Sequence, residues 1–107
     1  MFATKAARRV TIIVDGAIKA TILDKITELG AHGYNYVECQ GKGIHAITGD
    51  PYSGEHLVRI EVITTPEIGA TILDYIHAMQ FSHLRQYALS AFADNVEVDV
   101  RDQSLSE

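Results

Sequence analysis

The sequence has almost no cysteine, the residue whose disulfides cross-link many very small or secreted proteins. It has one cysteine, Cys39, and no tryptophan among its 107 residues. A single cysteine excludes an intramolecular disulfide and any zinc site built from several cysteines. A chain of this length can bury a core without such cross-links, and it is close to the commonest domain size. We therefore expect a single domain over residues 1–107.

Positive charge and long apolar runs are also scarce. Nine Lys and Arg stand against 14 Asp and Glu, which gives a formal net charge of −5. Non-specific binding to a polyanion needs an excess of basic residues, so we expect no nucleic acid as partner. No apolar run approaches the roughly 20 residues that span a bilayer, and the first residues lack the apolar stretch of a secretory signal. The expected location is cytoplasmic.

An internal repeat organises the residues that are present. The pentapeptide Ala-Thr-Ile-Leu-Asp occurs at residues 20–24 and again at residues 70–74. The same offset relates flanking residues, such as Ile18 to Ile68 and Arg9 to Arg59. Self-similarity over about 20 positions indicates two structural units of the same kind.

Each half predicts a strand, a helix and a second strand. Residues 9–14 and 57–64 are rich in β-branched residues, which is typical of strands. Segments 34–39 and 86–92 supply the strand that follows each helix. Between the strands, apolar residues recur at the three- and four-residue spacing of one helix face. These residues are Ile18, Ile22, Ile26 and Leu29 in the first half and Ile68, Ile72, Ile76 and Met79 in the second.

The ends of both helices also carry signals. Gly30 is placed to end the first helix, since glycine is favoured just past a helix C-terminus. Thr64, Thr65 and Pro66 mark the start of the second helix. With Thr64 as the cap, Glu67 supplies the acidic residue of a capping box.

The element order predicts an α+β fold, a ferredoxin-like βαββαβ sandwich with both helices on one face of an antiparallel sheet. Asp94-Asn95 predicts a turn, and the alternating valines from Asn95 to Arg101 predict an extra C-terminal strand before a polar tail at 102–107. The sheet face without helices keeps apolar residues. We therefore expect self-association, most simply as a closed ring.

The loop at residues 40–55 is where ligand binding is expected. It holds four of the eight glycines and is longer than a hairpin requires, which predicts a flexible, functional loop. Gly41-Lys42-Gly43 leaves backbone N–H groups free to surround an anion beside a cation. Neither a P-loop nor a dinucleotide fingerprint occurs. No motif surrounds the serines and no close histidine spacing occurs, so we expect neither an enzyme nor a resident cofactor.

At this point the residues resemble a known family. The segment Gly30-Ala-His-Gly33-Tyr-Asn-Tyr-Val-Glu-Cys-Gln-Gly41-Lys-Gly43 resembles the part of PII signalling proteins that leads into their T-loop. Arg59-Ile-Glu-Val-Ile63 resembles the strand that follows that loop. The resemblance covers most of residues 9–92. It implies a homotrimer that binds adenine nucleotides in clefts between subunits and signals through the T-loop.

The resemblance also implies nucleotide-binding residues. Glycine N–H groups would bind phosphates with a lysine nearby, Arg85 would replace a phosphate-binding lysine, and Asn35 would face the adenine from the neighbouring subunit. Ile63 and Thr64 would line the adenine and the ribose, and Arg101 would stand for a C-terminal arginine. The full set is Asn35, Gly41, Lys42, Gly43, Ile63, Thr64, Arg85 and Arg101.

Two departures point to one branch of the family. Ile44 and His45 replace the Arg-Gln pair of nitrogen-sensing members, which puts their binding of 2-oxoglutarate and magnesium in doubt here. The shortened loop is similar to the carbon-sensing branch, which comprises bicarbonate-transport regulators and carboxysome-associated PII-like proteins. The absence of a C-terminal cysteine pair favours the carboxysome-associated kind. The implied ligands are ADP or AMP, with ATP and cyclic AMP as further candidates, together with bicarbonate. The implied partner is a bicarbonate transporter or a carboxysome component.

Two other classes of protein stay open at this stage. One is a metal-binding ferredoxin-like trimer of the copper-tolerance type, for which His45 and His56 would be the candidate ligands. The other is a structural or amino-acid-binding ferredoxin-like module. Titration with nucleotide, with and without metal, separates the three classes.

Overall fold

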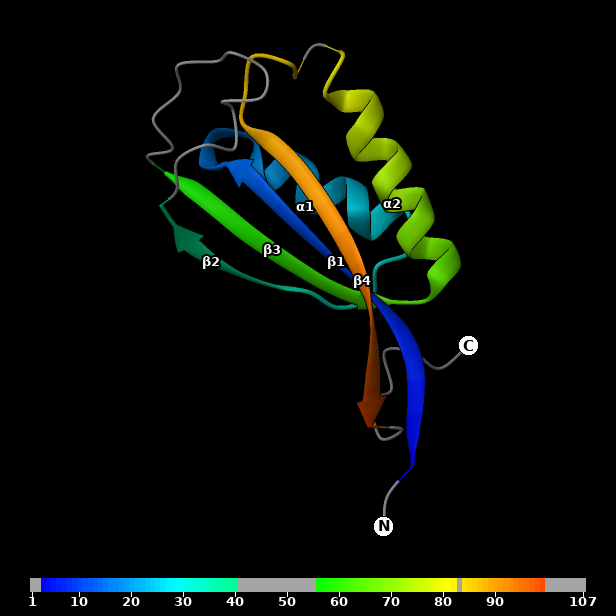
Figure 1. Ribbon diagram of the computed structural model, residues 1–107. Helices are drawn as coiled ribbons and strands as arrows, with labels where there is room; N and C mark the ends of the chain where they lie inside the picture. The colour runs from blue at the N-terminus through cyan, green and yellow to red at the C-terminus, as the bar shows by residue number, and fades with distance from the viewer. Residues whose placement is uncertain (1–2, 41–55, 83, 100–107) are drawn as a thin grey trace.

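Four strands and two α-helices make up the described part of the chain. The computed structural model describes residues 3–40, 56–82 and 84–99. The strands form one antiparallel sheet in the order β2-β3-β1-β4, and both helices pack against the same face (Figure 1). This confirms the predicted ferredoxin-like α+β fold. The elements are β1 (Thr4–Asp15), the 3-10 turn η1 (Gly16–Ile18), α1 (Lys19–Glu28), β2 (Asn35–Cys39), β3 (Leu57–Thr64), α2 (Pro66–Met79) and β4 (Leu89–Asp99).

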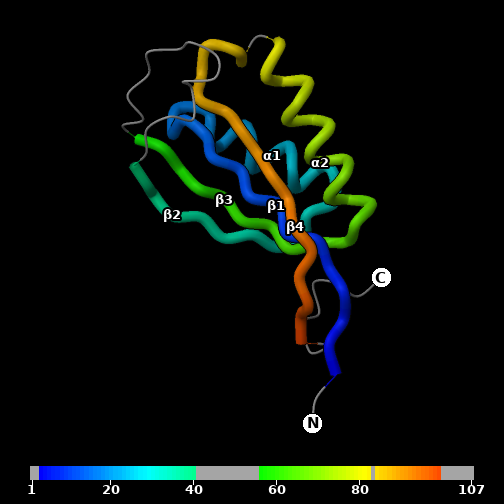
Figure 2. The backbone as a smooth tube through the Cα atoms, viewed as in Figure 1, coloured from blue at the N-terminus to red at the C-terminus, as the bar shows by residue number. Residues whose placement is uncertain are grey.

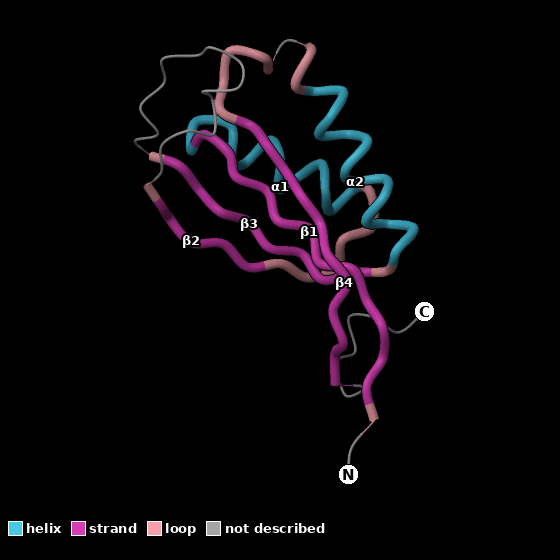
Figure 3. Tube along the Cα trace, in the orientation of Figure 1, coloured by secondary structure: helices cyan, strands magenta, loops and turns pink. Residues whose placement is uncertain are grey.

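The core lies between the sheet and the two helices, which form separate layers in Figure 3. Alternation along the strands turns every second side chain toward the helices. Five of the six isoleucines that the spacing placed on the helix faces are buried there, as predicted, and Ile68 is partly buried against the same core. Burying one such side chain contributes roughly 1.5–3 kcal/mol, so this layer supplies most of the driving force for folding. The side chains with no exposed surface include Val10, Ile12 and Val14 of β1, Ile22 and Ile26 of α1, Ile60 and Val62 of β3, and Ile72 of α2.

The helix ends follow the predicted signals with one correction. Gly30 has a φ of 117°, and the N–H of Ala31 donates to the carbonyl of Ile26 at 2.9 Å just after α1. The cap of α2 is Thr65 and not Thr64, because the Thr65 hydroxyl accepts from the N–H of Ile68 at 3.2 Å. Thr64 is the last residue of β3 and is buried in the sheet. Its register with β1 leaves it no role as a cap.

The predicted turn at Asp94-Asn95 is wrong, and so is a separate strand after it. β4 runs through both residues without a break, and it pairs with β1 from Leu89 opposite Val14 to Asp99 opposite Thr4. Strand β1 begins at Thr4, five positions before the predicted start at residue 9. Its longer N-terminal part pairs with the C-terminal part of β4. The polar side chains that suggested a turn bind across the ladder to two arginines of β1.

The long ladder projects beyond the rest of the sheet. β3 pairs with β1 only from Arg8 to Asp15, whereas β4 pairs with β1 as far as Thr4. Residues 4–7 and 96–99 therefore form a two-stranded ribbon, which we call the arm. Figure 2 shows it extending away from the helices.

Replacement of Gly30 by alanine is expected to lower thermal stability. Gly30 is the one glycine of the described residues with a positive φ, and a Cβ there would lie 3.2 Å from Cδ1 of Ile68. Strain of this kind costs about 1–3 kcal/mol, which corresponds to a melting temperature lower by several degrees. Scanning calorimetry measures the loss. Gly33→Ala is the matched control, and an equal loss in both variants would contradict this account.

Candidate functional site

The two ends of the sheet carry different predicted binding residues. At the end that we call the loop end, β2 stops at Cys39 while β3 and β4 start at Leu57 and Leu89. At the other end, which we call the arm end, β3 stops at Thr64, β2 starts at Asn35 and the arm projects. Gly41, Lys42, Gly43 and Arg101 lie outside the described residues.

Three of the predicted residues lie at the arm end, but on different faces of the sheet. Asn35 and Ile63 are on the face without helices, whereas Thr64 is on the helix side and is buried. Asn35 is exposed and pairs with Glu61 across the β2–β3 ladder. Ile63 pairs with Arg9 of β1 and is half-buried on the sheet face without helices, and Thr64 is the next residue along the strand. Asn35 and Ile63 can contribute an amide side chain and an apolar surface to a ligand on the helix-free face. No cation from the predicted set stands with them among the described residues.

Arg85 belongs to the loop end. It lies in the turns between α2 and β4, where its N–H donates to the carbonyl of Ser82 at 3.1 Å. Its neighbour Leu84 is buried and anchors this turn to the core. The guanidinium of Arg85 is exposed and has no partner among the described residues, so it is free to bind an anion.

A glycine locks the strands together at the loop end. The N–H of Gly16 donates to the carbonyl of His56 at 2.7 Å, and the N–H of Asp15 donates to that of Ala88 at 2.9 Å. A Cβ on Gly16 would lie 2.9 Å from the His56 carbonyl oxygen, a separation that side chains do not tolerate. His56 itself has a φ of 63°, an uncommon left-handed backbone for a residue other than glycine. The start of β3 is therefore held in one position against the end of β1.

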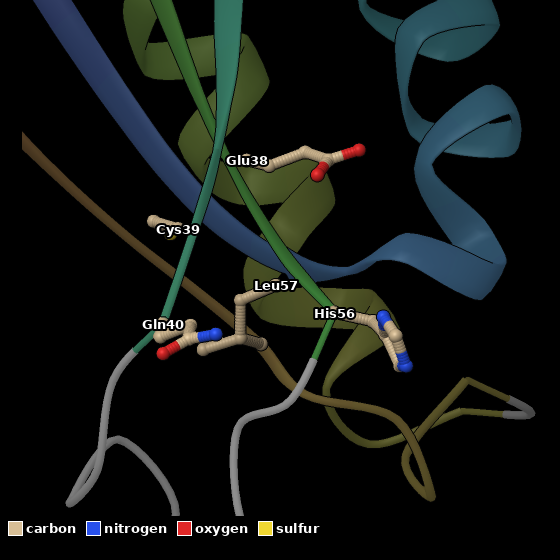
Figure 4. Close-up of a pocket in the computed structure, with 5 residues that line it drawn as sticks. All are labelled: Glu38, Cys39, Gln40, His56 and Leu57. Atoms are coloured by element: carbon tan, nitrogen blue, oxygen red, sulfur yellow. The ribbon is translucent and has the colours of Figure 1, made fainter.

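A polar cavity of about 440 Å³ opens at this end of the sheet. Its size lies within the range of ordinary small-molecule sites. Figure 4 shows Glu38 and His56 pointing toward the side of α1, whereas Cys39 points to the opposite side of the sheet. A smaller cavity of about 140 Å³ on the α1 side shares Glu38 and His56 and adds Gly16 and Lys19. The lining of the larger cavity is Glu38, Cys39, Gln40, His56 and Leu57.

An ion pair stands on the helix-free face near the arm end. Arg9 donates to Asp94 through Nε at 3.0 Å and Nη2 at 2.7 Å, and its Nη1 lies 3.9 Å from a Glu61 oxygen. These hydrogen bonds hold the pKa of the Asp94 carboxyl below its ordinary value and raise the pKa of Arg9. This bidentate contact between Arg9 and Asp94 fixes the position of β1 relative to β4 at this point.

The described residues give no support to a metal site. Within residues 3–40, 56–82 and 84–99, no three His, Cys, Asp or Glu side chains come close enough together to hold a metal ion. His56 lines the loop-end cavities, and His45 lies outside the described residues. None of the described helices has the length and apolar character needed to cross a membrane.

Comparison with known proteins assigns the family. The sequence matches the family model of nitrogen regulatory protein P-II over residues 7–100. The chain belongs to this family. It is therefore a PII-like regulator, and the predicted resemblance is confirmed at the level of the family. No curated protein matches the sequence.

Solved structures of PII-like proteins share the fold. A PII-like signalling protein from Thermus thermophilus is 24% identical, with a TM-score of 0.71 over 95% of this chain and 98% of that one. CPII from Thiomonas intermedia, bound to ADP, AMP and bicarbonate, is 20% identical, with a TM-score of 0.71 over 90% and 96%. CPII bound to ADP and bicarbonate aligns at 18% identity with a TM-score of 0.75 over 92% and 94%.

Some residues of the site were missed by the sequence reasoning. Gly16, Lys19 and Glu38 line the loop-end cavities together with His56, which the sequence had suggested only as a metal ligand. A glycine that directly follows the first strand was the one available signal for the Gly16–His56 contact. The larger cavity forms because the end of β2 lies beside the start of β3 in the sheet. The order of the strands in the sheet decides this, and the sequence alone does not show it.

Asp94→Asn is expected to reduce stability at neutral pH and to have less effect in acid. The Arg9 contact lowers the pKa of Asp94 in the folded protein. The stability that Asp94 contributes is therefore fully present above its unfolded pKa of about 3.9 and is lost as the pH falls through the lower folded pKa. The melting temperatures of the variant and the unmodified protein should therefore converge below about pH 4. Asp74→Asn, an exposed change on α2, is the control. A gap that stays constant with pH would contradict the assignment.

Proposed function

We propose that this PII-like regulator binds adenine nucleotides in clefts between the subunits of a homotrimer. The ligands are ADP or AMP, with ATP and cyclic AMP as further candidates. With bicarbonate bound beside the nucleotide, the protein reports inorganic-carbon or energy status through the loop at residues 40–55. The downstream partner would be a bicarbonate transporter or a carboxysome component, reached in the cytoplasm or at the carboxysome.

The observation that carries this proposal is the division of the predicted residues between the two ends of the sheet. Leu57 and Thr64 mark those ends on β3, seven residues apart, or about 23 Å at the rise of a strand. One small ligand cannot contact Thr64 and Arg85 of the same chain at once. A site that uses both ends needs the arm end of one copy against the loop end of another.

The charges of the loop end suit a nucleotide. The net charge of −5 repels an anionic ligand, so binding needs locally concentrated positive charge. Arg85 is exposed and without a partner among the described residues, and its planar guanidinium can bind two phosphate oxygens together. Gln40, which directly precedes Gly41-Lys42-Gly43, lies at the same end. The resemblance in fold to CPII, solved with ADP and bicarbonate, supports the same class of ligands.

The helix-free face supports the assembly. Phe92 is 52% exposed and Val37 is 56% exposed, although both are apolar, and Ile13 and Ile63 are half-buried beside them. Exposed apolar side chains on one sheet face are typical of a surface that a partner covers. Packing three such faces around an axis would remove them from water.

Light scattering is expected to give three times the 11.8 kDa mass of the chain at micromolar concentration. Phe92→Asp should shift the protein toward the monomer, because it places a charge on the face that the assembly buries. Phe81→Asp is the matched control, since Phe81 is 74% exposed at the end of α2, outside this face. An unmodified protein with the mass of a monomer would contradict the trimer and the intersubunit cleft with it.

Calorimetric titration is expected to detect binding of ADP or AMP, with higher affinity when bicarbonate is present. Arg85→Ala should weaken ADP binding by about 10-fold to 100-fold, since a charge-assisted hydrogen bond contributes roughly 1.5–3 kcal/mol. Lys42→Ala should lose less, because an ammonium does not bind two oxygens in the planar manner of Arg85. Lys25→Ala is the control, since Lys25 pairs with Glu28 on α1. Unchanged ADP affinity in both test variants would show that the phosphates bind elsewhere.

A further inference from the structure

Side chains of opposite charge face the smaller of the two loop-end cavities. This cavity of about 140 Å³ is lined by Gly16, Lys19, Glu38, His56, Leu57 and Val58. Lys19 begins α1, Glu38 belongs to β2, and His56 directly precedes β3. Figure 4 shows the side chains of Glu38 and His56 pointing to the α1 side of the sheet. Three different elements thus bring an ammonium, a carboxylate and an imidazole to one small space.

The fold leaves these polar groups available to a ligand. Neither Glu38 nor His56 has a side-chain hydrogen bond or an ion pair with any residue in the described part of the chain. The Lys19 ammonium lies 4.5 Å from the centre of the Tyr36 ring. This cation–π contact holds the ammonium in place without neutralising its charge. The cavity therefore presents one positive and one negative group, together with an imidazole that can donate or accept a hydrogen bond.

The backbone at His56 is held in an unfavourable conformation. Its φ of 63° is uncommon for a residue that carries a Cβ. The hydrogen bond of 2.7 Å from the N–H of Gly16 to the carbonyl of His56 maintains this conformation. Backbone strain of this kind costs stability, and it is concentrated at binding sites. A ligand that needs the imidazole in this position would account for the strain.

The charges suit a ligand that is itself both positive and negative. Tyr36 and Glu38 are two residues apart on β2, a Cα separation of roughly 6–7 Å. The ammonium above the ring forms no ion pair with the Glu38 carboxylate. A small anion in the cavity would be repelled by Glu38, and a small cation would be repelled by Lys19. A ligand with one charge of each sign can pair with both residues.

We propose that this cavity binds a small zwitterion, an α-amino acid with a small side chain. The ligand carboxylate accepts from the Lys19 ammonium and the His56 imidazole, and the ligand ammonium donates to the Glu38 carboxylate. A cavity of about 150 Å³ can hold one benzene molecule, and glycine and alanine are of similar size.

This site does not depend on the proposed nucleotide cleft. It lies on the helix side of the sheet, whereas Asn35 and Ile63 are on the helix-free face. All of its polar side chains come from one chain, so the site does not require a neighbouring copy.

NMR titration of the unmodified protein with glycine, in the absence of nucleotide, tests the site. The amides of Gly16 and His56 and the ring protons of His56 should shift in a saturable manner, with a Kd of about 0.1–10 mM for so small a ligand. Acetate and methylammonium each carry one half of the zwitterion and should bind at least about 10-fold more weakly. Equal binding of either fragment would overturn the proposal. Absence of any shift at about 50 mM glycine would also overturn it.

Two variants test the charged groups directly. Lys19→Gln and Glu38→Gln should each weaken glycine binding by about 10-fold or more, because each removes a charge-assisted contact. Lys25→Gln and Glu28→Gln are the matched controls, since they remove the same charges from a pair at the other end of α1. Both controls should bind glycine like the unmodified protein. Unchanged binding in the two test variants would overturn the assignment.

A third variant separates this site from the proposed function. Arg85→Ala removes the proposed phosphate contact and should leave glycine binding unchanged. Loss of glycine binding in this variant would place glycine at the phosphate site and overturn the inference. A protein that binds ADP but not glycine overturns this inference alone, whereas one that binds glycine but not ADP overturns the proposed function alone.

Discussion

The long antiparallel ladder between β1 and β4 is the interaction on which the rest of the structure depends. It joins the first strand of the fold to the last, from Val14 and Leu89 at one end to Thr4 and Asp99 at the other. On one face of this ladder, alternate residues pack against the two helices in the core. On the other side, the pair of Arg9 with Asp94 fixes the two strands near the arm end. The arm arises from the length of this ladder, because β4 pairs with β1 beyond the point where β3 ends.

Much of the fold could be predicted from the sequence because its signals are local. The three- and four-residue spacing of isoleucines placed the right side chains on the helix faces, and β3 has the predicted bounds from Leu57 to Thr64. Gly30 could be recognised because the positive φ that ends α1 favours glycine over other residues. Periodicity and turn chemistry depend on neighbours in the chain, and these are what a sequence contains.

The errors came where a distant partner decided the local structure. Asp94-Asn95 has the composition of a turn, but the ladder partners of these residues are Arg9 and Arg8, which bind their side chains and keep the strand extended. Thr64 and Thr65 are equally good caps by composition, and pairing of Thr64 within β3 left the role to Thr65. The candidate site divides for the same reason. A sequence position says which residue carries a group, but the sheet order decides at which end of the molecule the group lies.

The division of the candidate residues between two ends has a consequence for mixtures of chains. In the proposed assembly, each cleft takes its loop end from one chain and its arm end from the next. A chain impaired at Arg85 and a chain impaired at Thr64 are each inactive in a uniform trimer. In a mixed trimer, the chain impaired at Thr64 supplies an intact loop end, and the chain impaired at Arg85 supplies an intact arm end. The cleft between these two ends contains no impaired residue. Two defective forms of this protein would then complement one another in the same cell, because the unit of function is the junction between chains.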